Sequence, residues 1–509
     1  MRRMPLRLSF VLVFFFGFLV CLAGTVGARP PQVKTSRLEV KISVTSTSPA
    51  RVHVEGRRRE GATAWSFRNF YGSIAGLAER VENFTLSDDG GASIAVRKLA
   101  PGEFTAASAA TRFAYDVKLA PPAFASDAAH VSWLGAGHGL LMPGDLLPQP
   151  LADAKVTIQL PAGWAVSTVD EKGSDGAYNL SDAERAVFAV GRDLREKQGR
   201  AAGRMAFALV TAGEWAFNDG EAAQSIEEIL DIYNDVTRAV PAQSASVVLL
   251  PMPQPVPGNV WAAETRGPTV VLISGSLPSK LAAKAQLDGS LTHELFHLWV
   301  PNGLALEGEY DWFYEGFTNY VAMRVAMRRG QLTFNDYLNT LGLEFDAYRA
   351  ARGAKESSLV EASQKRWAGA ASLIYHKGAL VAFLYDLTLR RETGGKSSLE
   401  DAYPELFRRH ARGFARVEGN RALVELLGGM AGMRDFVERY VTGSGEINLS
   451  RAIEAFGLRV EPGGARTHVG VAPSADTRQR ELLRKLGYNE KLDAEAKRLH
   501  DQMKKRPPK

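Results

Sequence analysis

The chain has 509 residues, of which 45% are hydrophobic and 23% charged; this composition excludes a largely disordered polypeptide, and the length exceeds what one hydrophobic core can organise. The formal net charge of +6 arises at the two ends, because three arginines within the first seven residues supply +3 and residues 497–509 supply +5. The remainder is slightly acidic, which argues against a nucleic-acid-binding surface. Cys21 is the single cysteine, so internal disulfides and cysteine-based metal sites are excluded.

Residues 1–28 predict an export signal. The N-terminal arginines precede an apolar run over residues 8–22, and Val26, Gly27 and Ala28 offer a small-residue cleavage site. An uncleaved membrane anchor is the alternative, because this apolar run is long for a signal peptide. Both interpretations place the body of the protein outside the cytoplasm, and the scarcity of cysteine favours a bacterial periplasm.

Residues 36–169 predict an N-terminal β-rich domain. Apolar and polar residues alternate over residues 38–44 and again over residues 154–160, and turn residues separate such runs. Short alternating strands of this kind are typical of an antiparallel β-sandwich.

The hydrophobic period then changes from that of strands to that of helices. A strand is predicted over residues 269–274, and helical spacing begins near Leu281 and continues to about Phe456, as in residues 379–387. We therefore expect a multidomain α+β protein, with a catalytic domain over residues 170–325 and a helical domain over residues 326–456. Residues 457–509 are expected to form a C-terminal extension that ends in a basic tail.

The strongest functional signal is the HExxH motif of residues 291–298, which read LTHELFHL. Positions four apart share a helix face, so His293 and His297 can bind one metal ion while Glu294 reaches a water on that ion. Zinc held in this way lowers the pKa of a bound water and polarises the scissile carbonyl, and Glu294 collects the proton as general base. The motif predicts zinc-assisted hydrolysis.

A catalytic zinc site needs a third protein ligand and one open position. Glu315 follows His297 by eighteen positions, within the sequence DWFYEGFTNY. This spacing allows the chain to turn back and present the carboxylate to the first helix. Asn319 lies four positions further along the same face and is a candidate to brace a histidine ligand; an ordinary exposed polar residue is the alternative.

Hydrolysis also needs a donor for the developing oxyanion. Tyr375, in the sequence YHKG, is a candidate because it opens a long predicted helix. A buried structural tyrosine is the alternative interpretation from the residues alone.

The motifs HELFHLW, WFYEGFTNY and YHKGALVAFLYDLTLR resemble those of the glycyl aminopeptidase family of zinc metallopeptidases. More distantly, they resemble the larger zinc aminopeptidase family that includes leukotriene hydrolase. From about Ser36 to Phe456, the resemblance implies a β-rich N-terminal domain, a thermolysin-like catalytic domain and a helical domain. It implies one zinc ion per chain bound by His293, His297 and Glu315, with Glu294 as base and Tyr375 as transition-state stabiliser.

The resemblance also implies a glutamate that binds the free amine of the substrate. The corresponding residue is Glu264, although the usual family sequence G-L-E-H is replaced around it by Ala262, Ala263 and Thr265. A solvated loop glutamate is the alternative. Many relatives carry a C-terminal PDZ domain; we expect it to be missing, because residues 457–509 are too few and lack its glycine-rich loop.

Together these features predict a zinc-dependent peptidase that cleaves exported peptides, with the character of an aminopeptidase favouring glycine or alanine at the N-terminus. Peptides are the expected partners, and contact with a membrane is expected only through an uncleaved N-terminal segment. One alternative is an exported endopeptidase with an open cleft. Another is a catalytically silent peptide-binding protein on the same fold, although binding alone has no need of the general base Glu294.

Overall fold

The structure is a computed structural model that describes residues 38–201, 203–351, 357–461 and 464–491. The predicted export signal and the basic C-terminal tail both lie outside these residues. Among the described residues, no helix combines the length and the hydropathy that crossing a bilayer requires.

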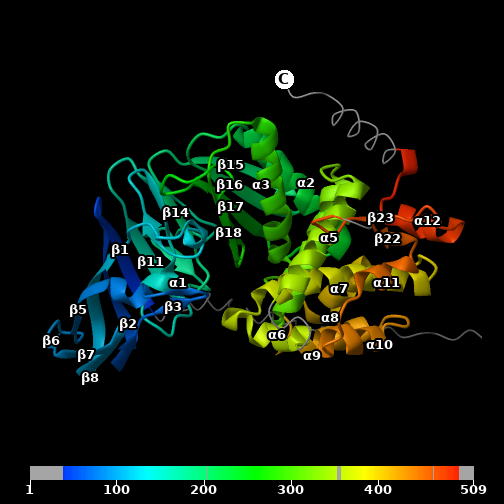
Figure 1. Cartoon of the computed structure of the whole chain (residues 1–509). Helices are drawn as coiled ribbons and strands as arrows, with labels where there is room; N and C mark the ends of the chain where they lie inside the picture. Colours follow the sequence, from blue (N-terminus) through cyan, green and yellow to red (C-terminus); the bar gives the residue numbers. More distant parts are fainter. Residues whose placement is uncertain (1–37, 202, 352–356, 462–463, 492–509) are drawn as a thin grey trace, which may run out of the picture. The chain divides into compact units, whose positions relative to one another are not determined.

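The N-terminal region contains an eight-stranded sheet whose strand order is β13-β11-β1-β2-β8-β5-β6, with β7 paired to β8 (Figure 1). In β1, the side chains of Leu38, Val40 and Ile42 are buried and their neighbours are less so, as expected of a strand with one face on a core. The strands of this sheet are β1 (Leu38–Thr47), β2 (Ala50–Ser66), β5 (Val81–Ser87), β6 (Ser93–Ile94), β7 (Val96–Ala100), β8 (Glu103–Lys118), β11 (Ala154–Gln159) and β13 (Tyr178–Leu180).

A four-stranded sheet, in the order β12-β14-β10-β9, lies next in the fold. Leu141 and Phe188 on one face pack into the core of the eight-stranded sheet, whereas Leu140 and Ala189 on the other face pack against the sheet that follows. The strands are β9 (Trp133–Leu134), β10 (His138–Leu141), β12 (Ala165–Ser167) and β14 (Phe188–Gly191), and a small hairpin is formed by β3 (Phe70–Tyr71) and β4 (Ile74–Ala75). Short helical turns are η1 (Leu77–Arg80), η2 (Ala125–Asp127) and α1 (Pro143–Leu146).

A five-stranded mixed sheet, in the order β15-β16-β17-β19-β18, supports the central region. Val248 and Val271 on one face contact the four-stranded sheet, and Val247 and Leu272 on the other face pack with α2 and α3 into the largest core. The elements are β15 (Arg195–Ala201), β16 (Met205–Thr211), α2 (Asp219–Thr237), β17 (Ser244–Pro251), β18 (Trp261–Arg266), β19 (Thr269–Ser274) and α3 (Lys280–Glu294). Strand β18 is antiparallel to β19 and lies at the end of this sheet.

Helices dominate the chain after α3, which continues into a 3₁₀ segment, η3 (Leu295–Leu298). The following elements are β20 (Leu306–Glu307), η4 (Trp312–Phe317), α4 (Thr318–Arg328), α5 (Phe334–Ala350), α6 (Leu359–Gln364), η5 (Arg366–Ala368), α7 (Ala371–Glu392), η6 (Leu399–Asp401), α8 (Ala402–His410), β21 (Val417–Glu418), α9 (Gly419–Gly429), α10 (Arg434–Val437), η7 (Glu438–Thr442) and α11 (Leu449–Glu454). Helix α7 is buried along most of its length, which explains the apolar run predicted at residues 379–387.

The chain after residue 457 packs into the same core as the preceding helices. It forms β22 (Leu458–Val460), β23 (Val469–Val471) and α12 (Thr477–Lys485). Leu458, Val469 and Leu483 are buried members of the large core cluster, and β23 lies against α5 (Figure 1). The described part of the C-terminal extension is therefore integrated into the helical region.

This architecture confirms the predicted multidomain α+β class, with a sheet-rich N-terminal region and a helical C-terminal region. One pairing departs from the expected antiparallel pattern, because β1 and β11 are parallel. The N-terminal sheets also extend past the boundary expected at residue 169, since β13 pairs with β11 and β14 pairs with β10. Alternation reveals individual strands, but it does not reveal which strand each will pair with.

Candidate metal centre

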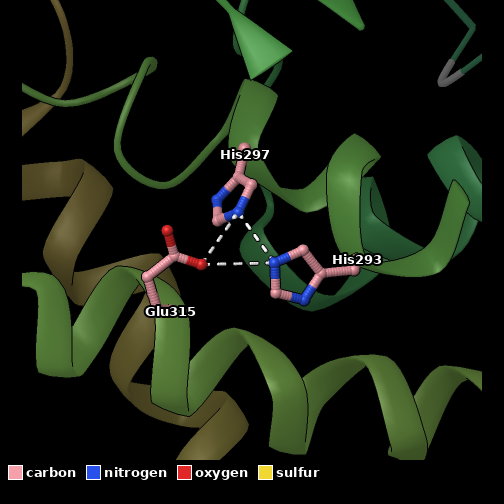
Figure 2. Close-up of side chains that lie close together, drawn as sticks. All are labelled: His293, His297 and Glu315. Carbon is pink, nitrogen blue, oxygen red and sulfur yellow. Dashed lines mark hydrogen bonds and ion pairs between the residues drawn. The ribbon is translucent and has the colours of Figure 1, made fainter. Parts of the chain in front are cut away.

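The two histidines of the HExxH motif lie where α3 passes into η3. Ser279 caps the start of α3, and Leu287 and Leu291 bury one face of the helix in the core. The Tyr233 hydroxyl donates a hydrogen bond to the Thr292 carbonyl and so ties the helix end to α2. His293 lies in the last turn of α3 and His297 follows in the 3₁₀ segment, with both imidazoles directed to the same side (Figure 2).

Glu315 is presented by η4, a π-helical segment that begins at Trp312. The Trp312 amide is held by Ser363 Oγ at 2.9 Å, and its indole N–H donates to Asn420 Oδ1 at 2.9 Å. Single π-turns occur frequently at functional sites, because the wider turn redirects a side chain. Here the buried Glu315 carboxylate faces the two histidines.

The three side chains bring one ligand atom each to a single point, with all three atoms within 4.8 Å of one another. Nε2 of His293 lies 3.0 Å from Nε2 of His297 and 3.3 Å from Oε2 of Glu315, and the remaining separation is 3.6 Å (Figure 2). Ligand atoms roughly 2.0–2.1 Å from a tetrahedral zinc are about 3.3–3.4 Å apart. The donor set and its spacing therefore fit a zinc ion.

Hydrogen bonding and charge around these groups favour positive charge between them. His297 Nδ1 lies 2.8 Å from the Val300 carbonyl, which places the proton on Nδ1 and leaves Nε2 free as a ligand. Burial alone would lower the pKa of His297, but Glu315 and Glu294 raise it to about 9. Burial would raise the pKa of Glu315, but hydrogen bonds from both histidines and the charge of Arg366 hold it well below its usual range.

Glu294 is buried at the end of α3 and its side chain is held by Thr265 on β18. Thr265 Oγ1 lies 2.8 Å from Glu294 Oε2 and 2.8 Å from the Glu294 carbonyl oxygen. The hydroxyl has one proton, which it can donate to either oxygen. The strand at the end of the sheet thereby orients the carboxylate predicted to act as base.

Tyr375 lies on the first part of α7, beside Glu315. Burial raises the pKa of Tyr375, and the nearby Glu315 charge adds to this effect. Gly316 and Gly378 allow α7 to approach η4 closely, because a Cβ built on Gly316 would lie 2.6 Å from Cα of Gly378. This glycine contact explains physically why a glycine follows Glu315 and another lies three positions after Tyr375.

Arg366 is a member of the site that the sequence did not reveal. Its Nη2 lies 2.9 Å from Glu315 Oε1 and 3.0 Å from the Tyr375 hydroxyl, and its Nη1 lies 2.7 Å from Asp311 Oδ1. No sequence motif marks this arginine. It lies in the short turn η5, which comes before the helix α7 that carries Tyr375. Asp311, Tyr314, Arg366 and Trp367 also line a hollow of about 410 Å³ beside the site.

Glu264 lies on β18 and has its own hydrogen-bond partners. Tyr71, on β3, donates a hydrogen bond to its carboxylate. His130 Nδ1 lies 3.0 Å and Arg266 Nε 3.3 Å from its carboxylate. Burial would raise the pKa of Glu264, but Arg266 and His130 lower it overall. Within the described residues, no hydrogen bond joins Glu264 to the metal cluster of His293, His297 and Glu315.

Asn319, predicted to brace a histidine ligand, lies half-buried at the start of α4. Across the described ranges it makes no hydrogen bond with His293 or His297. The Val300 carbonyl holds the His297 imidazole instead.

Comparisons with known proteins place this site in context. Residues 286–381, which contain the metal cluster, Glu294 and Tyr375, match the family model of the M61 glycyl aminopeptidases. A comparison with curated protein sequences finds no match.

Solved structures share the fold at low sequence identity. An aminopeptidase N family protein from Idiomarina loihiensis superposes with a TM-score of 0.69 at 18% identity, covering 83% of this chain and 79% of that one. A mutant of the M1 zinc metallopeptidase from Deinococcus radiodurans superposes with a TM-score of 0.50 at 14% identity, covering 81% of this chain and 94% of that one. The resemblance to glycyl aminopeptidases is therefore confirmed over the segment that carries the site, and the chain is a peptidase with the fold of these metallopeptidases.

Proposed function

We propose that the protein is a zinc-dependent aminopeptidase that acts on peptides outside the cytoplasm and favours a small N-terminal residue such as glycine or alanine. The observation that carries the proposal is the triangle of ligand atoms from His293, His297 and Glu315, with Glu294 next in sequence to one of them. The match of this segment to the glycyl aminopeptidase model supports both the metal and the substrate class. One zinc ion per chain would complete the site.

The side chains around the cluster suit hydrolysis of an amide. When bound, zinc supplies a Lewis acid that polarises the scissile carbonyl and makes a water molecule more acidic. Glu294, held by Thr265, takes the proton of the attacking water and passes it to the nitrogen of the departing amine. The Tyr375 hydroxyl donates a hydrogen bond to the oxyanion that develops on the carbonyl.

The aminopeptidase character depends on recognition of the free amine. Glu264 supports it, because its carboxylate, in a side chain that is only 16% exposed, has a pKa that Arg266 and His130 lower overall. A buried carboxylate favours an ammonium partner in a surrounding of low dielectric constant. To bind a substrate amine, Glu264 would exchange one of its present donors, Tyr71 or His130, for the ammonium group.

The test is hydrolysis of a panel of aminoacyl reporter amides, glycine and alanine included, each with its amine free or blocked, together with zinc analysis. Stoichiometric zinc with cleavage of free-amine substrates alone is the expected result. Cleavage of blocked peptides would replace the aminopeptidase by an endopeptidase. Zinc without cleavage of any substrate would contradict the proposed hydrolysis and favour a peptide-binding protein.

A further inference from the structure

The two terminal nitrogens of Arg366 contact four acceptors around the metal cluster. Nη2 contacts Glu315 Oε1 at 2.9 Å and the Tyr375 hydroxyl oxygen at 3.0 Å. Nη1 contacts Asp311 Oδ1 at 2.7 Å and the Tyr314 hydroxyl oxygen at 3.1 Å. Each terminal nitrogen carries two N–H bonds, so the four acceptors match its four terminal donors.

We infer that Arg366 is a positioning residue that holds a metal ligand, Glu315, and the oxyanion donor, Tyr375, in their working orientations. The inference rests on the proposed function, because it assigns Glu315 and Tyr375 the roles given there. Arg366 itself touches neither the ligand atom of Glu315 that faces the histidines nor the place where the oxyanion develops. It acts through the two side chains that it binds.

For Glu315, the geometry separates the two carboxylate oxygens. Arg366 engages Oε1, whereas Oε2 lies 3.3 Å from His293 Nε2 and 3.6 Å from His297 Nε2. A charge-assisted hydrogen bond from the guanidinium group anchors the carboxylate oxygen that accepts it. With Oε1 fixed, Glu315 cannot rotate Oε2 away from the two histidines without breaking a charge-assisted hydrogen bond.

For Tyr375, the direction of the hydrogen bond decides where its proton points. Arg366 has only donors, so in this contact the Tyr375 oxygen accepts. The hydroxyl proton of Tyr375 must then point away from Arg366, which leaves it available for another acceptor. A hydroxyl whose lone pair is occupied by an arginine also becomes a stronger donor, because the two hydrogen bonds polarise each other.

Arg366 is in turn braced by its surroundings. The Asp311 carboxylate binds Nη1, and the Tyr314 hydroxyl donates to that carboxylate at 2.5 Å. The Trp367 indole covers the guanidinium, with its ring centroid 4.8 Å from Cζ. The Arg366 side chain is only 15% exposed. A lysine at this position has a single ammonium group and cannot serve two pairs of acceptors in one plane.

Two measurements on Arg366→Gln and Arg366→Lys test the inference. Zinc transfer from each holoenzyme to a chelator should be about 10–100-fold faster than from the wild type, the usual cost of losing a group that orients a metal ligand. This readout does not depend on turnover. In the second measurement, kcat of Arg366→Gln should fall about 10–100-fold with little change in KM, because the substrate's own contacts are retained.

A double-mutant cycle with Tyr375→Phe separates positioning from general structural support. If Arg366 acts through the Tyr375 hydroxyl, Arg366→Gln should lower kcat by a smaller factor in the Tyr375→Phe background than in the wild type, because only the part that acts through Glu315 remains. Unchanged zinc transfer together with fully additive losses in kcat would overturn the inference. Should the wild type hydrolyse no peptide, the proposed function fails, but the rate of zinc transfer still decides the part that concerns Glu315.

Arg195→Gln is a matched control. Arg195 pairs with the carboxylate of Asp219 at 2.8 and 3.2 Å and donates to the Gly213 carbonyl, and it lies on β15, at the opposite end of the five-stranded sheet from β18. Zinc transfer and kcat of this variant should equal those of the wild type. Arg366→Lys keeps the positive charge, so it would not have a folding defect that is caused by removal of the charge. Thermal unfolding of each variant reports whether its fold is intact.

Discussion

Each chemical group of the site is oriented by a second group that comes from another part of the chain. Val300 holds His297, Thr265 holds Glu294, and Arg366 holds both Glu315 and Tyr375. Side chains fixed in this way lose little conformational freedom when a substrate or metal ion binds, and this preorganisation favours catalysis. Predictions at the residue scale therefore concern the reacting groups and their direct partners.

Glu294→Gln should keep zinc but lose hydrolysis, because the amide is close in shape to the carboxylate and has no basic oxygen to accept a proton at neutral pH. We expect activity to fall by at least about 10²-fold, measured with the free-amine reporter panel alongside metal analysis. Glu227→Gln, an exposed glutamate on α2, is the control and should have wild-type activity. Substantial hydrolysis by Glu294→Gln would refute its assignment as base.

Thr265→Val should impair turnover without affecting zinc content. Valine has the shape of threonine but cannot donate to Glu294 Oε2, so the carboxylate loses a bond worth about 1.5–3 kcal/mol. We expect kcat/KM to fall about tenfold or more, and Thr265→Ser to recover most of it because serine keeps the hydroxyl. Equal kinetics for the valine and serine variants would show that the hydroxyl does not orient the base.

At the scale of elements, the close crossing of η4 and α7 brings Glu315 and Tyr375 into one site. Gly316 and Gly378 meet there, and both lack the Cβ that would separate the two backbones. The π-helical turn of η4 and the start of α7 therefore depend on each other. The two motifs that carry these glycines act as one structural unit.

Gly378→Ala should separate these two elements. A Cβ on Gly378 would lie 2.8 Å from Gly316 Cα and 3.0 Å from the Trp312 carbonyl oxygen, and neither is a side chain that can move aside. We expect a loss of about 1–3 kcal/mol in unfolding free energy from overpacking, together with a lower kcat because Tyr375 moves from Glu315. Gly289→Ala, on α3, where a Cβ meets no atom within 4 Å, is the control and should retain activity. A variant of Gly378 with unaltered stability and kcat would contradict the proposed packing.

At the scale of the whole molecule, one hydrophobic cluster extends from Ala201 on β15 to Leu486. The cluster includes the face of the five-stranded sheet that packs against helices, the helices around the metal cluster, and the strands β22 and β23. The helices that carry the site are therefore supported by residues near the end of the described chain. A substitution in this distant segment should reduce the stability of the entire helical region.

Leu483→Ala tests this connection. Leu483 on α12 is fully buried, so its truncation should cost about 2–5 kcal/mol of unfolding free energy. Leu281→Ala, at a leucine that is 82% exposed on α3, should cost less than about 0.5 kcal/mol. Chemical unfolding followed by fluorescence measures both. A loss below about 1 kcal/mol at Leu483 would indicate that α12 does not support the helical core.

Local patterns in the sequence were sufficient to predict the secondary structure around the site and the three residues that meet there as candidate metal ligands. The strand at residues 269–274 and the buried helix at residues 379–387 follow from hydrophobic period. His293 and His297 are paired by helical spacing alone, and Glu315 by a nearby motif. These features depend on residues close in the sequence or on the resemblance to known motifs, so no knowledge of the tertiary structure was needed.

Only the tertiary structure decided which groups surround those ligands. Thr265 reaches Glu294 because β18 lies at the end of the sheet beside α3, and Tyr71 reaches Glu264 from far earlier in the chain. Arg366 has no motif, and its contacts exist because η5 turns the chain back toward η4. Hydrophobic period predicts which face of an element is buried, whereas the direction of a polar side chain depends on partners that long-range packing brings together.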